Sequence, residues 1–387
     1  GPKQHKIVGR PLADLRQRLA NTRLPEQETV SDFSQGVPLK TVQQVLSHWQ
    51  TKYDWRKVEA KLNSYPNFIT EIDGLDIHFI HVRSKHENAL PLVVTHGWPG
   101  SIVEQLKIIE PLTNPTEHGG SASDAFHVVI PSMPGYGFSG KPTTTGWGPE
   151  RIASASTTLM RRLGYQHFVA QGGDWGAVVT EMMGVQAPPE LLGIHTNMPG
   201  AIPTEVDQAS FLGAPAPSGL SAEEKSIYDQ LAFFYKHVYY AFEMATRPQS
   251  LTALADSPIG LATFLLDHDA RSLEMIARSF DGEAEGVTPD DFLDNVTLFW
   301  LTNTGVSSAR LYWENKLGFF SPKGVKVPTA VSVFPDEIYG TSRKWAEQAF
   351  PNLIHYNKVE KGGHFAAWEQ PKLYTEELRA GFRSLRK

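Results

Sequence analysis

A carboxylate within a glycine-rich turn is the residue of this chain whose surroundings best suit covalent chemistry. Asp174 lies in the run GGDWG, which follows an apolar stretch ending at Ala170 and precedes a helix-prone stretch from Ala177 to Val185. A strand that enters a helix through small-x-nucleophile-x-small makes a tight turn that exposes the central side chain, and glycine permits the close packing of such a turn. The alternative is an ordinary turn in which Asp174 caps the following helix, so partners elsewhere must decide.

Two further groups follow later strands of the same expected sheet. A strand from Thr329 to Phe334 leads to Asp336 and Glu337, and a strand from Leu353 to Val359 leads to His364. Nucleophile, acid and base then lie at strand ends in the chain order of an elbow-based catalytic triad. Together, the order and the strand ends outweigh the ordinary interpretation of each residue alone.

The choice of the triad acid is limited to two residues, because the loop after another strand contains no carboxylate. The residues that follow the strand from Leu191 to Thr196 contain no carboxylate. The acid must therefore be Asp336 or Glu337, and we favour Glu337.

A carboxylate nucleophile restricts the reaction to displacement at an sp3 carbon. A serine that attacked such a carbon would form an ether, which hydroxide cannot reverse, whereas Asp174 forms an ester that water can attack. Asp174 is ionised at neutral pH, since the ordinary pKa of aspartate is about 4. His364, oriented by Glu337, would therefore activate water rather than the nucleophile.

Two backbone N–H groups are candidates for holding the oxyanion that forms on Asp174 when water attacks. The motif HGWPGS begins at His96, directly after an expected buried strand from Leu90 to Thr95, and a loop at this place supplies one oxyanion donor in such sheets. We expect the donors to be the N–H groups of Trp98 and Trp175. One donor typically contributes about 3 to 4 kcal/mol. A simple Pro-Gly turn is the alternative for the HGWPGS motif.

An alternation of helices and strands would position these groups. It predicts a mostly parallel central sheet with helices on its faces. Between Gly200 and Phe320 the pattern changes to helices rich in aromatic residues, the usual place for a lid that shapes a substrate pocket, although most of these rings would serve a helical core. Further expected elements are helices at Pro11 to Leu24, Leu39 to Leu62, Ile102 to Leu112, Arg151 to Leu163 and Gln370 to Leu385, and strands at Leu75 to Val82 and Phe126 to Ile130.

One glycine motif does not indicate a nucleotide site. Residues 135–140 match GxGxxG formally, but Lys141 and Pro142 follow where the helix of a dinucleotide site should begin. We interpret this stretch as a loop.

Composition excludes several classes of partner. The 387 residues carry a net charge of −6, with 41% hydrophobic and 20% charged residues, so no basic surface indicates nucleic acid. The absence of cysteine removes disulfide bonds, thiolate metal sites and cysteine nucleophiles. No apolar stretch approaches the roughly 20 residues of a membrane span. These features predict a cytoplasmic globular protein with neither a membrane nor a nucleic acid as partner.

The leaving group separates the two reactions open to an aspartate elbow. An opened epoxide leaves an alkoxide, which is too basic to depart unaided, so its site should offer acids such as tyrosine hydroxyls, whose ordinary pKa is about 10. A halide needs only N–H donors. The helical insertion is rich in tyrosine, which favours an epoxide without selecting individual tyrosines.

The chain resembles the epoxide hydrolases of the alpha/beta-hydrolase superfamily, and within them the microsomal type. The resemblance covers nearly the whole length, and it implies Asp174 as nucleophile, His364 as base and Glu337 as the acid. It also implies two lid tyrosines, Tyr240 and Tyr312, that hydrogen-bond and protonate the epoxide oxygen. The motifs that carry it are DLRQRLANTRLP from Asp14, HGWPGS from His96, PGYGFS from Pro134, GGDWG from Gly172, TRP from Thr246, SSARLYWEN from Ser307, FPDE from Phe334 and GGHFAAWEQP from Gly362. Tyr239 is the nearest alternative to Tyr240.

The resemblance further implies a division of the chain into three parts. Residues 1–70 would form the N-terminal meander of this family, residues 71–200 and 321–387 the alpha/beta-hydrolase core, and residues 201–320 the helical lid. Some members of the microsomal type begin with a membrane anchor, which no stretch of this chain fits, so we expect a soluble member. The expected reactants are an epoxide and water, with no cofactor and no metal.

Our hypothesis is therefore an epoxide hydrolase that forms a vicinal diol through an ester on Asp174. A haloalkane or haloacid dehalogenase shares the aspartate nucleophile, and a catalytically silent hydrolase fold could serve as a small-molecule receptor. The aromatic lid favours a bulky or aryl epoxide. Whether the chain forms a homodimer, and whether it acts in detoxification or in secondary-metabolite biosynthesis, is open.

Overall fold

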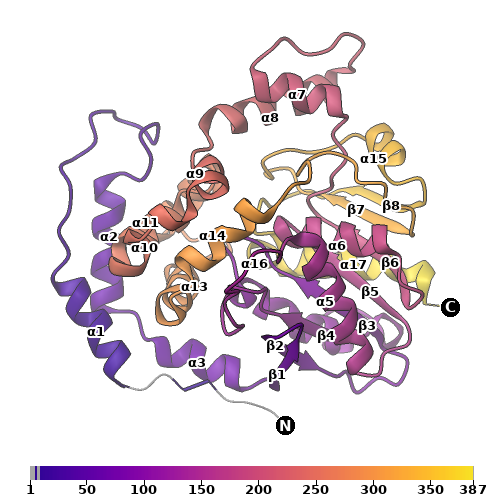
Figure 1. Ribbon diagram of the computed structural model, residues 1–387, viewed down its shortest axis with the longest axis horizontal. Helices are drawn as coiled ribbons and strands as arrows, with labels where there is room; N and C mark the ends of the chain where they lie inside the picture. The colour runs from indigo at the N-terminus through magenta and orange to yellow at the C-terminus, as the bar shows by residue number, and fades with distance from the viewer. Residues whose placement is uncertain (1–4, 7–8, 387) are drawn as a thin grey trace.

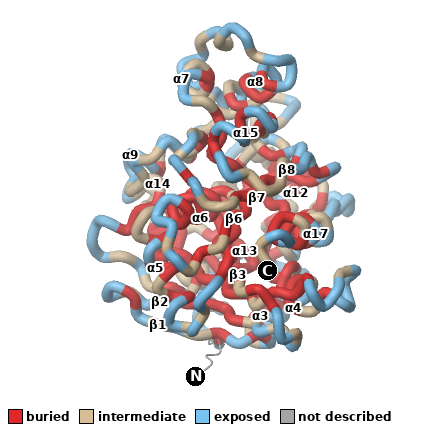
Figure 2. The backbone as a smooth tube through the Cα atoms, turned by 90° about the vertical axis from the view of Figure 1, so that its right-hand side faces the viewer, coloured by how far each residue is buried: buried red, intermediate tan, exposed pale blue. Residues whose placement is uncertain are grey.

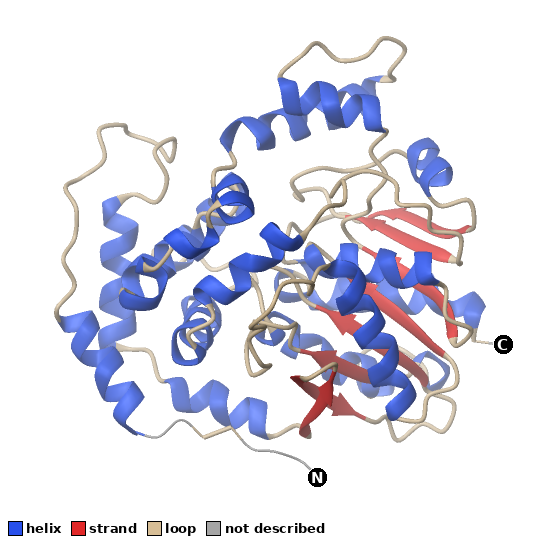
Figure 3. Cartoon of the chain, viewed as in Figure 1, coloured by secondary structure: helices blue, strands red, loops and turns tan. Residues whose placement is uncertain are grey.

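Eight strands form one continuous sheet in the computed structural model, which describes residues 5–6 and 9–386. The strand order is β1-β2-β4-β3-β5-β6-β7-β8, and the sheet occupies one side of the molecule in Figures 1 and 3. β2 is antiparallel to β1 and β4, whereas every other pair is parallel. The strands are β1 Asn67–Ile72, β2 Leu75–Val82, β3 Leu90–Thr95, β4 Phe126–Pro131, β5 Phe168–Gly172, β6 Leu191–Thr196, β7 Thr329–Val333 and β8 Leu353–Lys358.

Helices cover both faces of this sheet. Figure 2 shows α5 and α6 on one side of the strands and α4 and α17 on the other. The helices outside the segment between β6 and β7 are α1 Gly9–Ala20, α2 Leu39–Thr51, α3 Trp55–Asn63, α4 Ile109–Thr113, α5 Pro149–Arg162, α6 Trp175–Gln186, α15 Arg343–Ala349, α16 Ala366–Glu369 and α17 Pro371–Phe382, with short 3-10 helices η1 Ile102–Ile108, η2 Pro115–Glu117, η3 Ala122–Asp124 and η5 Arg383–Leu385.

The inner strands are buried on both faces because uninterrupted apolar residues fill them. Leu92, Val93 and Val94 of β3 and Val169 of β5 have no accessible surface, as expected for parallel strands between layers of helices. The carboxyl ends of β3, β5, β7 and β8 meet at one edge, since these strands run in the same direction. Side chains that follow those ends are therefore brought together.

A helical segment connects β6 to β7 and lies beside this edge, with α7 and α8 at the top of Figure 1. Helices α1, α2 and α3 pack on its outer side, where α1 contacts α11, and α2 and α3 contact α13. Among the described residues, no helix has the length and apolar character needed to span a membrane. The helices of the segment are α7 Thr204–Leu212, α8 Ala222–His237, α9 Tyr240–Thr246, η4 Pro248–Ser250, α10 Ala253–Asp256, α11 Pro258–Leu266, α12 Ala270–Phe280, α13 Pro289–Thr302 and α14 Gly305–Glu314.

The structure differs from the expected elements mainly before β2. The helix expected from Leu39 to Leu62 is two helices, because Asp54 is extended and its carboxylate caps α3 by accepting from the N–H of Arg56. The strand β1 was not expected; it reaches β2 through Asp73 and Gly74, whose φ values of 53° and 80° suit a tight hairpin turn. Elsewhere, the helix expected from Ile102 to Leu112 begins with the 3-10 helix η1.

Candidate active site

The bend between β5 and α6 gives Asp174 an unusual backbone conformation, with φ 53° and ψ −130°. A Cβ on Gly172 would lie 2.0 Å from the carbonyl oxygen of Gly176, and a Cβ on Gly176 would lie 2.0 Å from that of Thr95. Only glycine therefore fits on each side of the bend. Asp174 occupies the N-cap position of α6 but makes no capping hydrogen bond through its side chain, so the ordinary capping interpretation does not apply.

The carboxylate of Asp174 is buried between a hydrogen-bond donor and a histidine. The N–H of Trp98 donates to Oδ2 at 2.7 Å, and Nε2 of His364 lies 3.3 Å from Oδ1. Burial would raise the pKa of Asp174, but the hydrogen bond and charge of His364, the charge of His268 and the N–H of Trp175 outweigh burial and lower the pKa. Asp174 is thus an ionised carboxylate whose Oδ1 faces His364.

The loop that carries Trp98 is fixed from the helical segment. Asn295 of α13 donates through its amide to the carbonyl oxygen of Pro99 at 2.7 Å, and its own oxygen accepts from Oγ of Ser101 at 2.7 Å. Both bonds are buried, where an unpaired polar group would cost about 1–3 kcal/mol. The position of the Trp98 N–H therefore depends on α13.

Glu337 and His364, which follow β7 and β8, form a close pair. Oε1 of Glu337 lies 2.7 Å from Nδ1 of His364, whereas Asp336 lies 3.5 Å from Arg271 of α12. Burial lowers the pKa of His364, but the charges and hydrogen bonds of Glu337 and Asp174 outweigh burial and hold this pKa well above its ordinary value. Of the two candidate acids, Glu337 is the one in contact with the histidine.

Tyr240 at the start of α9 and Tyr312 on α14 pack against the aromatic rings beside Asp174. The ring centroids of Tyr240 and Trp98 are 4.9 Å apart, as are those of Tyr312 and Trp175. Burial, with a contribution from the charge of Asp174, raises the pKa of both tyrosine hydroxyls well above their ordinary value. Both hydroxyls therefore carry their protons at neutral pH.

Tyr239 has a different environment from its neighbour. Its side chain is 44% exposed, whereas Tyr240 is only 2% exposed. The ring of Tyr239 packs against Phe264, with centroids 5.8 Å apart. The structure therefore brings Tyr240, rather than Tyr239, to Trp98.

The PGYGFS loop holds α14 in place. Oγ of Ser307 donates to the carbonyl oxygen of Gly135 at 2.6 Å, and the hydroxyl of Tyr136 donates to the carbonyl oxygen of Ser308 at 3.0 Å. Both contacts are made near the start of the helix that carries Tyr312. The loop at 135–140 thus positions the start of α14, and the next helix after the loop, α5, begins only at Pro149.

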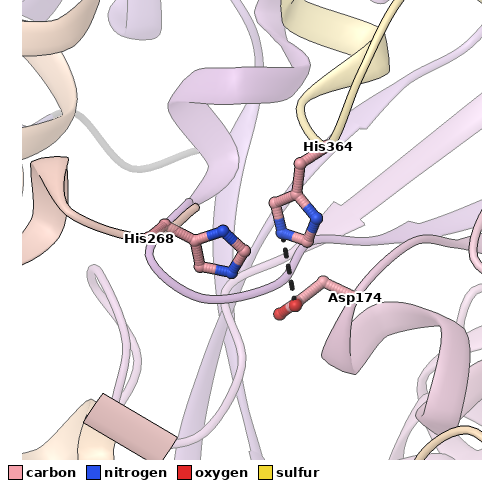
Figure 4. Close-up of side chains that lie close together, drawn as sticks. All are labelled: Asp174, His268 and His364. Carbon is pink, nitrogen blue, oxygen red and sulfur yellow. Dashed lines mark ion pairs between the residues drawn. The ribbon is translucent and has the colours of Figure 1, made fainter. Parts of the chain in front are cut away.

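His268, which the sequence did not single out, lies beside the same carboxylate. Figure 4 shows it next to His364 and Asp174; the two histidine rings are stacked with centroids 4.0 Å apart, and Nδ1 of His268 lies 2.8 Å from Oδ2 of Asp269. Asp174, His268 and His364 each offer one ligand atom within 4.8 Å of the others. This group could hold a metal ion, although the carboxylates of Glu337 and Asp269 already engage both histidines.

A parallel sheet that carries a nucleophile elbow at the end of β5 has the architecture of an alpha/beta-hydrolase, and the family model of the alpha/beta hydrolase fold matches residues 91–224. A second model, the epoxide hydrolase N terminus, matches residues 2–105. The chain is 50% identical over 377 residues to a putative epoxide hydrolase of Stigmatella aurantiaca, covering 97% of this chain and 83% of that relative. The chain belongs to the epoxide hydrolase family.

More distant relatives and solved structures agree with this assignment. Epoxide hydrolase 1 of Oryctolagus cuniculus is 37% identical over 385 residues, which cover 94% of this chain and 84% of the relative. The juvenile hormone epoxide hydrolase of the silkworm Bombyx mori superposes with a TM-score of 0.85 at 27% identity, over 100% of this chain and 94% of that one. The Aspergillus niger epoxide hydrolase gives a TM-score of 0.82 at 28% identity, over 100% and 96%.

Proposed function

We propose that this epoxide hydrolase converts its substrate to a vicinal diol through an ester on Asp174. The observation that carries the mechanism is the 2.7 Å hydrogen bond from the N–H of Trp98 to Oδ2 of the nucleophile itself. A donor on this oxygen stabilises the oxyanion formed when water attacks an ester of Asp174. It also leaves Oδ1 as the attacking atom.

In the first step, Oδ1 of Asp174 bonds to a ring carbon while the bond between that carbon and the epoxide oxygen breaks. The epoxide oxygen takes a proton from Tyr240 or Tyr312. Both hydroxyls are protonated, and the two tyrosine rings pack against Trp98 and Trp175 respectively. This is general acid catalysis of a leaving group too basic to depart alone.

In the second step, Nε2 of His364 takes a proton from water, and the water oxygen bonds to Cγ of Asp174. The N–H groups of Trp98 and Trp175 hold the resulting oxyanion, and the bond from Cγ to Oδ1 then breaks. Oδ1 leaves with the diol and takes up the proton held by His364. The oxygen of the water remains on the carboxyl group of Asp174, whose proton returns to the tyrosinate through solvent. Glu337 orients His364 throughout.

The charge of Asp174 links the two steps. In the free enzyme this charge raises the pKa of His364, so the histidine is protonated and cannot act as a base. Esterification removes that charge, so the pKa of His364 falls, while the charge of Glu337 continues to raise it. Ester formation thus moves His364 toward the neutral form that can act as a base.

A single turnover in heavy-oxygen water tests the proposal. The diol should carry unlabelled oxygen from Asp174, and mass spectrometry should find the label on the peptide that contains this residue. Label in the diol with none on the peptide would show direct attack of water on the epoxide and would refute the ester. Halide release from haloalkanes without epoxide turnover would favour a dehalogenase.

We also propose the three-part division at residues 70, 200 and 320, a cytoplasmic location, and a bulky apolar or aryl epoxide as substrate. The substrate class is supported by the rings around the nucleophile, those of Trp98, Trp175, Tyr240 and Tyr312. A panel of aryl and short alkyl epoxides tests it, since aryl epoxides should give the higher kcat/KM.

A further inference from the structure

A small cavity lies beside Asp174, apart from Tyr240 and Tyr312. It offers about 30 Å³ to the centres of water molecules and is bordered by Asp174 and His364 among other residues, but not by Tyr240 or Tyr312. One water molecule needs roughly 10–15 Å³ of such space. The cavity therefore has room for about two water molecules beside Asp174 and His364.

The cavity presents polar groups that suit a bound water. Thr95 and Gln105 border it, and Oγ1 of Thr95 and Oε1 of Gln105 are buried without a hydrogen-bond partner among the described residues. Glu104 also borders it and keeps some accessible surface. Buried polar groups are normally paired with protein or with ordered water, so this arrangement favours a hydrated cavity.

Glu104 is held at the cavity by the same loop that carries Trp98. Its Oε1 accepts from the N–H of Gly97 at 3.3 Å. A Cβ on Gly100 would lie 2.0 Å from Oε1 of Glu104, and a Cβ on Gly97 would lie 2.4 Å from Cβ of Asp174. The two glycines of the HGWPG motif thus make room for the nucleophile and for Glu104.

We propose that Glu104 is a positioning residue for the second step: its carboxyl group holds the hydrolytic water in this cavity, next to Cγ of Asp174 and Nε2 of His364. The inference rests on the proposed ester mechanism. Oε1 is occupied by the Gly97 N–H, so the second oxygen is the one available to the water. No bond to Glu104 is made or broken; the water gives its proton to His364.

The protonation of Glu104 matters for this function. Burial raises its pKa to about 8, with the N–H of Gly97 and the charge of His364 opposing the shift and the charge of Asp174 adding to it. At neutral pH the carboxyl group is protonated, so it adds no negative charge beside the oxyanion. The other titratable groups at the cavity are His96, whose pKa burial lowers to about 4, and Tyr374, whose pKa burial raises well above its ordinary value.

The test separates alkylation from hydrolysis with styrene oxide as the probe, by rapid quenching and the intact mass of the full-length enzyme. Glu104→Ala should lower the hydrolysis rate constant by about 10²-fold, since the water loses its orientation, and should leave the alkylation rate constant within about threefold. Glu104→Gln, which keeps a neutral hydrogen-bonding group of the same shape, should hydrolyse within about threefold of wild type at pH 7.

The pH profile supplies a readout that a structural role would not change. Wild-type hydrolysis should slow above about pH 8, as Glu104 ionises, and Glu104→Gln should lose this decline. Equal slowing of both steps in Glu104→Ala, or an unchanged alkaline decline in Glu104→Gln, would overturn the proposal; the second readout stands if the alanine variant does not fold. If wild type formed no ester on Asp174, the proposed mechanism itself would fail, and the two failures are therefore distinguishable.

Discussion

At the scale of single residues, the proposed mechanism assigns the formation of the ester on Asp174 and its breakdown to different groups around this carboxylate. The N–H of Trp98 and the charge of His364 act on different oxygens of one carboxylate. Asp174→Ala removes the atom that bonds to the substrate, and kcat should fall by about 10⁴-fold or more. Steady-state diol formation measures this, and circular dichroism checks the fold; residual turnover near the wild-type level would exclude Asp174 as the nucleophile.

His364→Gln should instead stop the reaction after the first step. Ester formation needs the ionised Asp174 and a tyrosine proton, whereas hydrolysis needs the base. The intact mass of the variant should therefore rise by the mass of one epoxide and stay there. His118→Gln, at an exposed histidine that does not border the cavity beside Asp174, is the matched control; normal turnover of His364→Gln would show that another group is the base.

Alkylation and hydrolysis should depend differently on pH. The pKa of Asp174 is lowered and the pKa values of Tyr240 and Tyr312 are raised, so alkylation should be flat from about pH 5 to about pH 9. Hydrolysis should rise with pH as His364 loses its proton in the ester, up to the decline above about pH 8 expected from the ionisation of Glu104. Single-turnover rates across pH measure both, and a rise in alkylation over the same interval would contradict the assignment.

At the scale of elements, α9 and α14 each bring one tyrosine ring against Trp98 or Trp175, and we propose that either hydroxyl can protonate the epoxide oxygen. Tyr240→Phe and Tyr312→Phe should each slow alkylation by roughly 10-fold, and the double variant by roughly 10³-fold or more, because general acid catalysis is lost only when both are removed. Tyr239→Phe, whose side chain is 44% exposed, is the control. A double variant that alkylates at the wild-type rate would remove both tyrosines from the mechanism.

At the scale of the whole molecule, one buried ion pair fastens both ends of the helical segment to the core. Glu181 of α6 accepts from the N–H of Gly200, where the segment begins, and from Nζ of Lys323, which also binds the carbonyl oxygen of Ser321 where it ends. The side chains of Glu181 and Lys323 are only 1% and 4% exposed.

Lys323→Met should leave the Glu181 carboxylate buried without its charge partner. Breaking a buried pair typically costs about 3–5 kcal/mol, so the free energy of unfolding should fall by that amount in a urea titration. The double variant Lys323→Met with Glu181→Leu should recover much of the loss. Unchanged stability in the single variant would mean that water reaches the carboxylate.

Much of this architecture could be predicted from sequence, and the failures have local causes. β2, β3 and β6 match their expected bounds because continuous or alternating apolar residues define them. The break at Asp54 depends on one capping hydrogen bond. It could not be predicted, because apolar residues continue at helical spacing on both sides of Asp54.

Some site residues could likewise be predicted from sequence motifs, and others could not. Asp174, Glu337 and His364 could be ordered from motifs at strand ends, while Tyr240 and Tyr312 required a family resemblance. His268 reaches the carboxylate only through tertiary packing, because it lies 94 positions after Asp174 in the sequence. Glu104, on η1, was not singled out from the sequence either, because only tertiary packing forms the cavity that it borders.

In the proposed mechanism, the cavity beside Asp174 makes the two half-reactions separately inhibitable. A compound that fills the aromatic side competes with the epoxide, and a higher substrate concentration relieves it. A small polar guest that displaced the cavity water would leave the first half-reaction intact, and substrate itself would drive the enzyme into a stalled covalent form. Such an inhibitor would gain potency as substrate accumulates, which is the opposite of what a competitive drug does.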